Sequence, residues 1–162
     1  MGMLEGKVVA VTGGGRGVGR EIALLAAQHG AAVVVNDPGV GGGGEGGDAG
    51  PAQQTVDDII AAGGKAHANL ASVTDPKGAA SIVEDAVQRF GRIDAVVNNA
   101  GILRDAIWHK MSREDWLSVI DVHLNGCFNV SKAATPLSDP RVVASASCAG
   151  CLISSVRAVP AR

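Results

Sequence analysis

The segment Thr12-Gly13-Gly14-Gly15-Arg16-Gly17-Val18-Gly19 separates a short β-branched run, Lys7–Thr12, from Gly17–His29, where apolar residues recur at helical spacing. These patterns predict a strand and a helix joined by a tight glycine turn. Glycines at this place let the backbone approach a pyrophosphate, and the N–H groups at the start of the helix point toward it. We therefore expect the phosphate site of a dinucleotide here. The alternative is a turn without a ligand, because glycine is common in this chain, with 23 residues.

Strand and helix patterns alternate along the rest of the chain. Further strands are predicted at Ala31–Asn36, Lys65–Leu70, Ile93–Asn98 and Arg141–Ser145. Further helices are predicted from Pro51 to Ala62, from Pro76 to Phe90 behind the cap Asp75, and, as one long helix, from the cap Ser112 past Val130. The alternation predicts an α/β fold: an open, doubly wound parallel sheet of the Rossmann type, formed by residues 1–162 as a single domain.

The glycine-rich segment Gly39–Gly50 follows the second predicted strand. Its composition favours a flexible loop. A phosphate-binding role is the alternative, although these glycines do not lie between a strand and an immediately following helix.

Composition and charge exclude several classes of protein. The chain has 162 residues, of which 46% are hydrophobic and 19% charged, which excludes a charge-rich disordered chain. The formal net charge is -2 and no basic run stands out, so neither nucleic acid nor a membrane is an expected partner. Met1–Lys7 has no apolar region of the signal-peptide type, and we expect a cytoplasmic protein. Cys148-x-x-Cys151 is compatible with a redox pair or half a zinc site, but no second Cys/His pair completes it, so no metal is expected.

Asp37 ends the second predicted strand, about twenty residues after the glycine turn. A carboxylate there accepts hydrogen bonds from the adenosine ribose hydroxyls and repels a 2′-phosphate, which favours NAD over NADP. Arg16 is a counter-signal, because its guanidinium is able to pair with that phosphate. The alternative for Asp37 is a loop carboxylate exposed to solvent.

Two motifs together resemble the short-chain dehydrogenase/reductase family. They are Thr12-Gly13-x-x-x-Gly17-x-Gly19 and Asn98-Asn99-Ala100-Gly101, and the resemblance runs from Leu4 to about Ala134. Asn36-Asp37, the glycine-rich segment and the run from Asn98 to Asp105 more narrowly resemble the (3R)-hydroxyacyl-CoA dehydrogenase domains of peroxisomal multifunctional enzymes and their bacterial relatives. The 3-oxoacyl-ACP reductases are the nearest alternative.

The resemblance implies a set of cofactor-binding residues. Thr12, Gly13, Arg16, Gly17, Val18 and Gly19 would surround the pyrophosphate, Asp37 the ribose, and Asn99, Ala100 and Gly101 the nicotinamide side. Many family members carry an acidic residue after the third strand that contacts adenine, whereas this chain has Ala71 and Ser72. The adenine contact would then fall to Ser72 or to the backbone. The alternative for Asn98 and Asn99 is a structural role, tying neighbouring strands together.

The resemblance also implies catalytic residues, but part of the set is missing. Ser147 matches the family's catalytic serine, which hydrogen-bonds the substrate oxygen, and His123 stands where many members place an Asn of the proton relay. The alternatives are an ordinary serine at a strand end and a hydrogen-bonded packing histidine. The family's Tyr-x-x-x-Lys pair is absent: Pro160 stands near its place, and the chain contains no tyrosine.

The sequence therefore leaves two classes of function. One is an NAD(P)-dependent oxidoreductase acting on a 3-hydroxy/3-oxoacyl thioester, of which this chain is an inactive, C-terminally truncated or frame-altered copy with an incomplete second half and a divergent tail at 135–162. The other is a non-catalytic nucleotide-binding fragment or decayed copy. Family members form homo-oligomers, and self-association is expected here because the missing elements would leave apolar faces uncovered.

Overall fold

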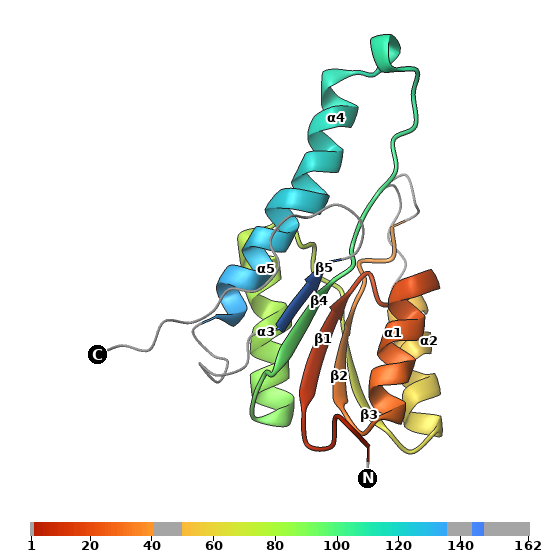
Figure 1. Ribbon diagram of the computed structural model, residues 1–162, viewed down its shortest axis with the longest axis vertical. Helices are drawn as coiled ribbons and strands as arrows, with labels where there is room; N and C mark the ends of the chain where they lie inside the picture. The colour runs from red at the N-terminus through yellow and green to blue at the C-terminus, as the bar shows by residue number, and fades with distance from the viewer. Residues whose placement is uncertain (1, 41–49, 136–143, 148–162) are drawn as a thin grey trace, which may run out of the picture.

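The computed structural model describes residues 2–40, 50–135 and 144–147, and its centre is a parallel sheet of five strands. The strands are β1 (Val8–Thr12), β2 (Ala32–Asn36), β3 (Lys65–Asn69), β4 (Ala95–Asn98) and β5 (Ala144–Ser147), in the order β3-β2-β1-β4-β5 (Figure 1). From β1 the chain adds β2 and β3 on one side of the sheet, and β4 and β5 then follow on the other side. The strand order therefore reverses between β1 and β4. In such sheets a crevice opens at this point, beyond the carboxyl ends of the strands.

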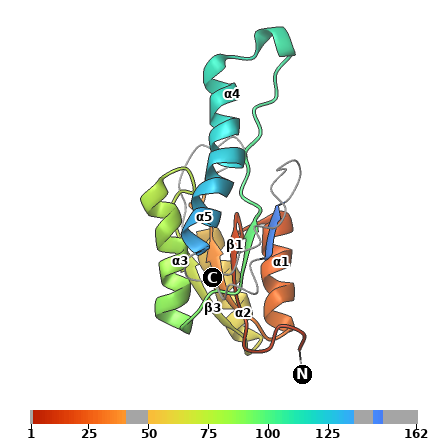
Figure 2. The ribbon, with the colours of Figure 1, turned by 60° about the vertical axis from the view of Figure 1, so that its left-hand side comes forward.

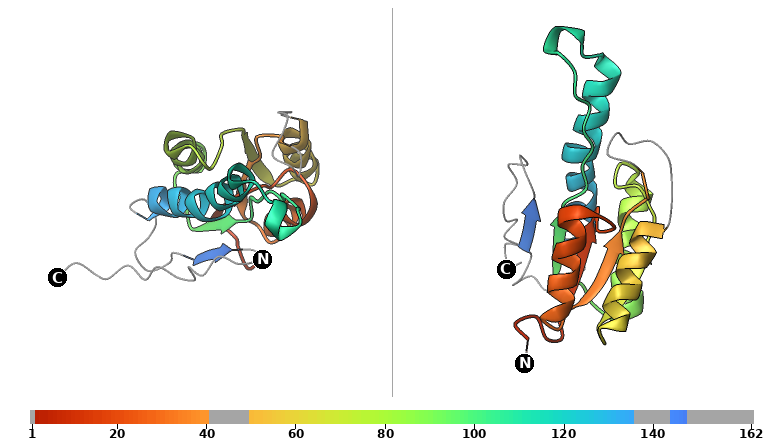
Figure 3. Two further views of the ribbon diagram at one scale, coloured as in Figure 1. Left: turned by 90° about the horizontal axis from the view of Figure 1, so that it is seen from above. Right: turned by 90° about the vertical axis from the view of Figure 1, so that its right-hand side faces the viewer.

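Helices cover both faces of the sheet, as the alternating sequence pattern predicts. Helices α1 (Gly17–Gln28) and α2 (Gly50–Ala61) pack on one face, which the right-hand view of Figure 3 shows from the helix side. Helices α3 (Pro76–Phe90) and α5 (Gly126–Ala134) pack on the other. The doubly wound parallel sheet expected from the sequence is thus confirmed.

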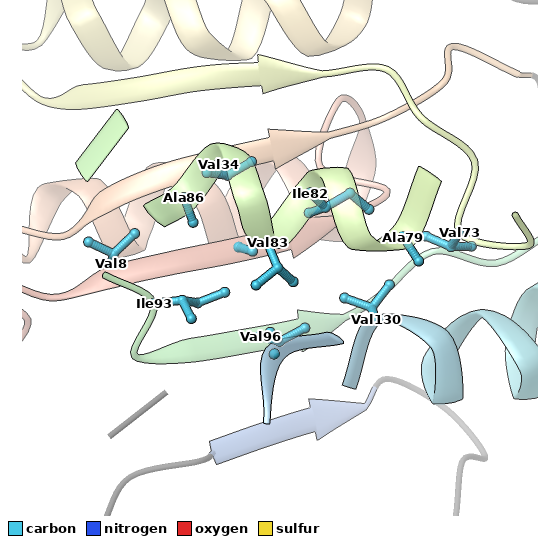
Figure 4. Packing of buried hydrophobic residues seen from close by; sticks show 12 residues of the cluster. Val8, Val34, Val73, Ala79, Ile82, Val83, Ala86, Ile93, Val96 and Val130 are labelled. Atoms are coloured by element: carbon cyan, nitrogen blue, oxygen red, sulfur yellow. The ribbon is translucent and has the colours of Figure 1, made fainter. Parts of the chain in front are cut away.

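The strands are apolar on both faces because each face carries a helix layer. In β1, Val8 and Ala10 belong to the core under α3 and α5, whereas Val9 and Val11 belong to the core under α1 and α2. Figure 4 shows the first of these cores, where Ile82 and Val83 of α3 meet β1 and β4. The strand alternation of period two therefore assigns each residue to one layer.

The predicted long helix after Ser112 is not one regular helix. It consists of α4 (Arg113–Ile120), a π-helical turn η2 (Asp121–Asn125) and α5, and Gly126 N–H donates to Asp121 O five residues back. Figures 1 and 2 show α4 rising away from the sheet. The prediction of a continuous helix was wrong at η2, because a 3.6-residue pattern does not reveal one extra residue in a turn.

Other boundaries differ little from the expectations. The fifth strand, predicted at Arg141–Ser145, is found at Ala144–Ser147. Helix α2 begins at Gly50, so the last residue of the predicted glycine-rich loop is helical, and positions 41–49 lie outside the described residues. Most of the predicted divergent tail, 136–143 and 148–162, also lies outside them.

The described residues contain neither a membrane-spanning helix nor a group of metal-binding side chains. None of their helices is long and apolar enough to cross a membrane. None of their His, Cys, Asp and Glu side chains form a group of three or more that could hold a metal ion. The cytoplasmic location stays a prediction.

A buried carboxylate joins the amino ends of β1 and β4. Asp94 is 4% exposed and accepts hydrogen bonds from Val8 N–H (2.9 Å), Lys7 Nζ (3.2 Å) and Arg92 Nε (2.8 Å). Burial by itself raises the pKa of Asp94, but the bonds from Arg92, Val8 and Lys7 outweigh this effect and hold the pKa below its ordinary value of 3.8. The ionised form is therefore favoured by folding.

The depressed pKa predicts a pH dependence of stability. A group whose pKa is lower in the folded than in the unfolded protein contributes stability above the unfolded pKa and loses it as the pH falls through the folded pKa. We expect the free energy of unfolding to fall below about pH 4, and the variant Asp94→Asn to lack this part of the loss. At neutral pH this variant should be less stable by about 1–3 kcal/mol, because Arg92 and Lys7 lose their partner. Denaturant unfolding across the acid range measures both effects, and equal acid sensitivity of the two proteins would contradict the assignment.

Candidate functional site

A cavity of about 600 Å³ lies at the carboxyl ends of β1, β2 and β4, where the strand order reverses. Nine of the predicted cofactor-binding residues line it: Gly13, Arg16, Val18, Gly19, Asp37, Ser72, Asn99, Ala100 and Gly101. The fold therefore brings together residues that are far apart in the sequence. Two predicted residues, Thr12 and Gly17, are not among the lining residues.

The glycine turn between β1 and α1 is packed too closely for a side chain at Gly19. Gly13 has φ +63°, in the left-handed region that favours glycine. A Cβ at Gly19 would lie 2.0 Å from Gly13 O and 2.4 Å from Asn99 Nδ2. The amide of Asn99 also donates to Thr12 O and Gly13 O, both at 3.0 Å. The start of α1 is thus pressed against the ends of β1 and β4, and the backbone of Gly13 and Gly19 lines the cavity directly.

Thr12 supports the site from below. It is 1% exposed, its Oγ1 donates to Val97 O at 3.3 Å, and the same oxygen accepts from Asn99 N–H and Ala100 N–H at 3.0 Å each. These bonds fix the segment after β4 against the end of β1. In this structure Thr12 positions cavity residues and is not itself at the cavity surface.

The carboxylate of Asp37 lines the cavity and accepts hydrogen bonds from backbone N–H groups. It is 8% exposed, and its oxygens accept from Gly15 N–H at 3.0 Å and Gly39 N–H at 2.8 Å. The alternative of a solvent-exposed loop carboxylate is therefore wrong. Each carboxylate oxygen has a second lone pair, which leaves acceptor capacity for a ribose hydroxyl.

Arg16 lies at the rim of the cavity. Its guanidinium is exposed and donates to Val40 O at 3.4 Å, close to where the described part of the loop ends. Among the residues that the structure describes, this long hydrogen bond is the one that holds the side chain. The side chain is free to turn toward an anion near Asp37. Arg16 therefore still counts against a preference for NAD over NADP.

The nicotinamide-side segment Asn99–Gly101 forms the opposite part of the cavity. His123 of η2 supports it from behind: its Nε2 lies 3.2 Å from Ile102 N and 3.0 Å from Ile102 O. A Cβ at Gly101 would come within 2.6 Å of the imidazole. His123 is not among the cavity-lining residues. Its contacts are those expected of a hydrogen-bonded packing histidine, and its role in a proton relay stays a prediction.

Asn98 and Ser147 mark the carboxyl ends of β4 and β5. The two residues are partners in the parallel register, so the backbone places Ser147 at the edge of the sheet that carries the cavity. Asn98 Nδ2 donates to Ser131 Oγ at 3.1 Å, which ties the end of β4 to helix α5 and not to a neighbouring strand.

Sequence reasoning missed other residues of the cavity. Asn36, Val73 and Thr74 line it on the side of Asp37, and Arg104 and Asp121 line it on the side of α4. Asn36 carried a signal, because it is a polar residue directly after three buried valines in a strand. Asp121 carried none, because its position depends on the π-helical turn.

The geometry agrees with a comparison to known families. The family model for short chain dehydrogenases matches residues 7–159. The chain belongs to this family. The short-chain dehydrogenase motifs quoted from the sequence are thus placed around one cavity, as the resemblance implied.

Individual short-chain dehydrogenases and related enzymes are similar over most of the chain. The peroxisomal multifunctional enzyme type 2 of Drosophila melanogaster is 50% identical over 132 residues, which are 82% of this chain and 22% of that protein. The 3-oxoacyl-[acyl-carrier-protein] reductase of Thermotoga maritima is 40% identical over 137 residues, 82% of this chain and 50% of that protein. The chain thus spans half or less of the length of these relatives.

Solved structures of other dehydrogenases are similar as well. A short chain dehydrogenase from Mycobacterium avium is 47% identical with a TM-score of 0.77, over 84% of this chain and 49% of that one. A 7α-hydroxysteroid dehydrogenase, solved as a complex with NADH and 7-oxo glycochenodeoxycholic acid, is 30% identical with a TM-score of 0.74, over 83% and 49% of the two chains.

Proposed function

We propose that this short-chain dehydrogenase chain binds NAD in the cavity between the glycine turn, Asp37 and Asn99–Gly101. The observation that carries the proposal is the convergence, in one cavity, of a glycine turn with no room for a side chain at Gly19 and the buried carboxylate of Asp37. A family whose members include an NADH complex supports it. Equilibrium titration of the purified chain with NAD tests it directly.

Different residues along the cavity would contact different parts of NAD. The N–H groups at the start of α1 would face the pyrophosphate, Asp37 the adenosine ribose, and Ser72 the adenine side. Bound NAD supplies the hydride acceptor, and Asn99–Gly101 would fix its nicotinamide end. Ser147, at the sheet edge beside Asn98, would hydrogen-bond the substrate oxygen.

The substrate class that we propose is a 3-hydroxy/3-oxoacyl thioester. It rests on two similar proteins, a peroxisomal multifunctional enzyme and a 3-oxoacyl-[acyl-carrier-protein] reductase, and on the resemblance carried by Asn98–Asp105. The second candidate is a nucleotide-binding fragment without turnover. It is favoured by the absence of tyrosine from all 162 residues.

The cavity should prefer NAD over NADP. A 2′-phosphate would approach the buried carboxylate of Asp37, and the exposed Arg16 is the one nearby group of the described residues placed to offset that repulsion. We expect Kd for NAD to be at least about tenfold lower, since repulsion of roughly 1.4 kcal/mol gives that factor. In Asp37→Ser the preference should shrink, and NAD binding should weaken because Gly15 and Gly39 lose their acceptor. Tighter binding of NADP to the unmodified chain would show that Arg16 outweighs Asp37.

Self-association is proposed from the exposed apolar side chains of the helical segment after Ser112. Trp116 is 45%, Leu124 47% and Phe128 53% exposed, and Trp108 stacks edge-on against Trp116 with 5.9 Å between ring centroids. Exposed large apolar groups that follow one another along α4, η2 and α5 are typical of an interaction surface. We expect sedimentation to show dimers or larger species, and Trp116→Glu with Phe128→Glu to shift them toward monomer. A monodisperse monomer of the unmodified chain would contradict the proposal.

A further inference from the structure

The segment Ala71–Thr74, here called the adenine-side wall, is held by side-chain amides from two other elements. Ser72, Val73 and Thr74 line the cavity. From the end of β2, Asn36 Nδ2 donates to Ala71 O at 2.8 Å. From α5, Asn129 Nδ2 donates to Val73 O at 3.1 Å and to Thr74 O at 3.4 Å. Backbone carbonyls along the wall are therefore tied to both the sheet and the helix layer.

The orientation of the Asn36 amide is set by its neighbours. Ala71 N–H donates to Asn69 Oδ1 at 3.0 Å, so Asn69 presents its oxygen on this side, and its Nδ2 donates to Asp85 at 2.7 Å. Asn36 must then turn its Nδ2 toward Asn69 Oδ1, which it meets at 3.0 Å. Asp85, Asn69 and Asn36 thus form a hydrogen-bonded chain from α3 to the wall.

Asn36 is an unfavourable choice for packing alone. It is fully buried after the valines of β2, and its Oδ1 has no hydrogen-bond partner in the part of the chain that the structure describes. A buried acceptor without a partner lowers stability, and an apolar side chain at this strand end would avoid that cost. The donors of Asn36 to the wall explain why an amide stands here.

We propose that Asn36 and Asn129 are positioning residues that fix the adenine-side wall for recognition of the adenine base. The proposal rests on the proposed NAD site. Ala71 offers no carboxylate to the base, so recognition falls to backbone groups and to Ser72. Backbone groups discriminate between bases only when their position is fixed, and the two amides fix the wall from opposite sides.

The test compares NAD with nicotinamide hypoxanthine dinucleotide, in which the purine carries a 6-oxo group in place of the 6-amino group and a proton on N1. The unmodified chain should bind NAD more tightly. Asn129→Ala should raise Kd for NAD about fivefold and bring the ratio of Kd for the hypoxanthine dinucleotide to Kd for NAD toward one. The reason is that the wall becomes more mobile when it loses hydrogen bonds to Asn129. Asn36→Ala should act in the same direction and more strongly. Asn125→Ala is the matched control. Asn125 lies one helical turn before Asn129, is exposed, and donates to Asp121 at 2.8 Å and not to the wall.

A second measurement does not depend on ligand. Amide hydrogen exchange of the ligand-free chain should speed up in Ala71–Thr74 for Asn129→Ala and stay unchanged for Asn125→Ala. Equal weakening of both dinucleotides with an unchanged ratio, or unchanged exchange in the wall, would overturn the positioning role. Failure of the unmodified chain to bind either dinucleotide would overturn the NAD site and the adenine role together, and the exchange data would still report whether the amides hold the wall.

Discussion

The 162-residue chain is expected to bind NAD and to oxidise a 3-hydroxyacyl-CoA at no more than a trace rate. Hydride transfer from an alcohol needs a base for the hydroxyl proton, and general acid–base catalysis contributes about 10²–10⁴-fold, or roughly 3–5 kcal/mol of barrier. The family's tyrosine is absent from this sequence. Ser147, which we propose hydrogen-bonds the substrate oxygen, does not replace this tyrosine, because a serine hydroxyl without an assisting base does not exchange its proton near neutral pH. NADH formation at saturating NAD measures the rate.

His123→Ala distinguishes the explanations if turnover is found. His123 is the one histidine placed close to the nicotinamide side among the described residues, although its Nε2 is engaged by Ile102. Robust turnover that disappears in the variant would identify His123 as the substitute base. Robust turnover in both proteins would contradict the loss of the acid/base function altogether.

Gly19→Ala is expected to abolish NAD binding and to destabilise the fold. The added methyl would lie 2.0 Å from Gly13 O, a backbone atom that cannot move without displacing the end of β1. Forcing extra volume into a packed site costs about 1–3 kcal/mol and sometimes more. The backbone that we propose faces the pyrophosphate would be displaced at the same time. Denaturant unfolding and NAD titration of the variant measure the two effects.

Gly17→Ala provides the matched control for stability. Gly17 lies two residues earlier in the same helix start, has φ +51°, and would have nothing within 4 Å of an added Cβ. Its substitution should cost only the backbone strain, about 1 kcal/mol. Equal destabilisation by the two substitutions would show that close packing at Gly19 is not what the turn requires.

The sequence predicted the sheet well because its signals are local. Valine runs such as that of β2, the cap Asp75 and the glycine Gly91 with φ +81° each act within a few residues. The same holds for the glycine turn, whose place between strand and helix is visible without any tertiary contact. Four of the predicted cofactor residues that line the cavity belong to this turn: Gly13, Arg16, Val18 and Gly19.

The parts that sequence reasoning missed depend on contacts between distant residues. Thr12 was placed with the cofactor, but its hydroxyl is consumed by Val97, Asn99 and Ala100, which lie on another strand and its loop. The wall contacts of Asn36 and Asn129 are likewise defined only once β2, β3 and α5 are assembled. Spacing along the chain contains no information about these pairings.

The π-helical turn η2 has a consequence for how the faces of the long helical segment are divided. A five-residue step is equivalent to one residue inserted into an α-helix, and one residue rotates all later side chains by about 100° around the axis. Val130 and Ala134 of α5 are thereby turned onto the sheet, while Trp116 and Leu117 of α4 point elsewhere. The side chains of α4 and α5 therefore face in different directions, and the continuous helical segment has two separate surfaces. We expect a substitution on the exposed surface of α4 to leave the core under α5 unaffected.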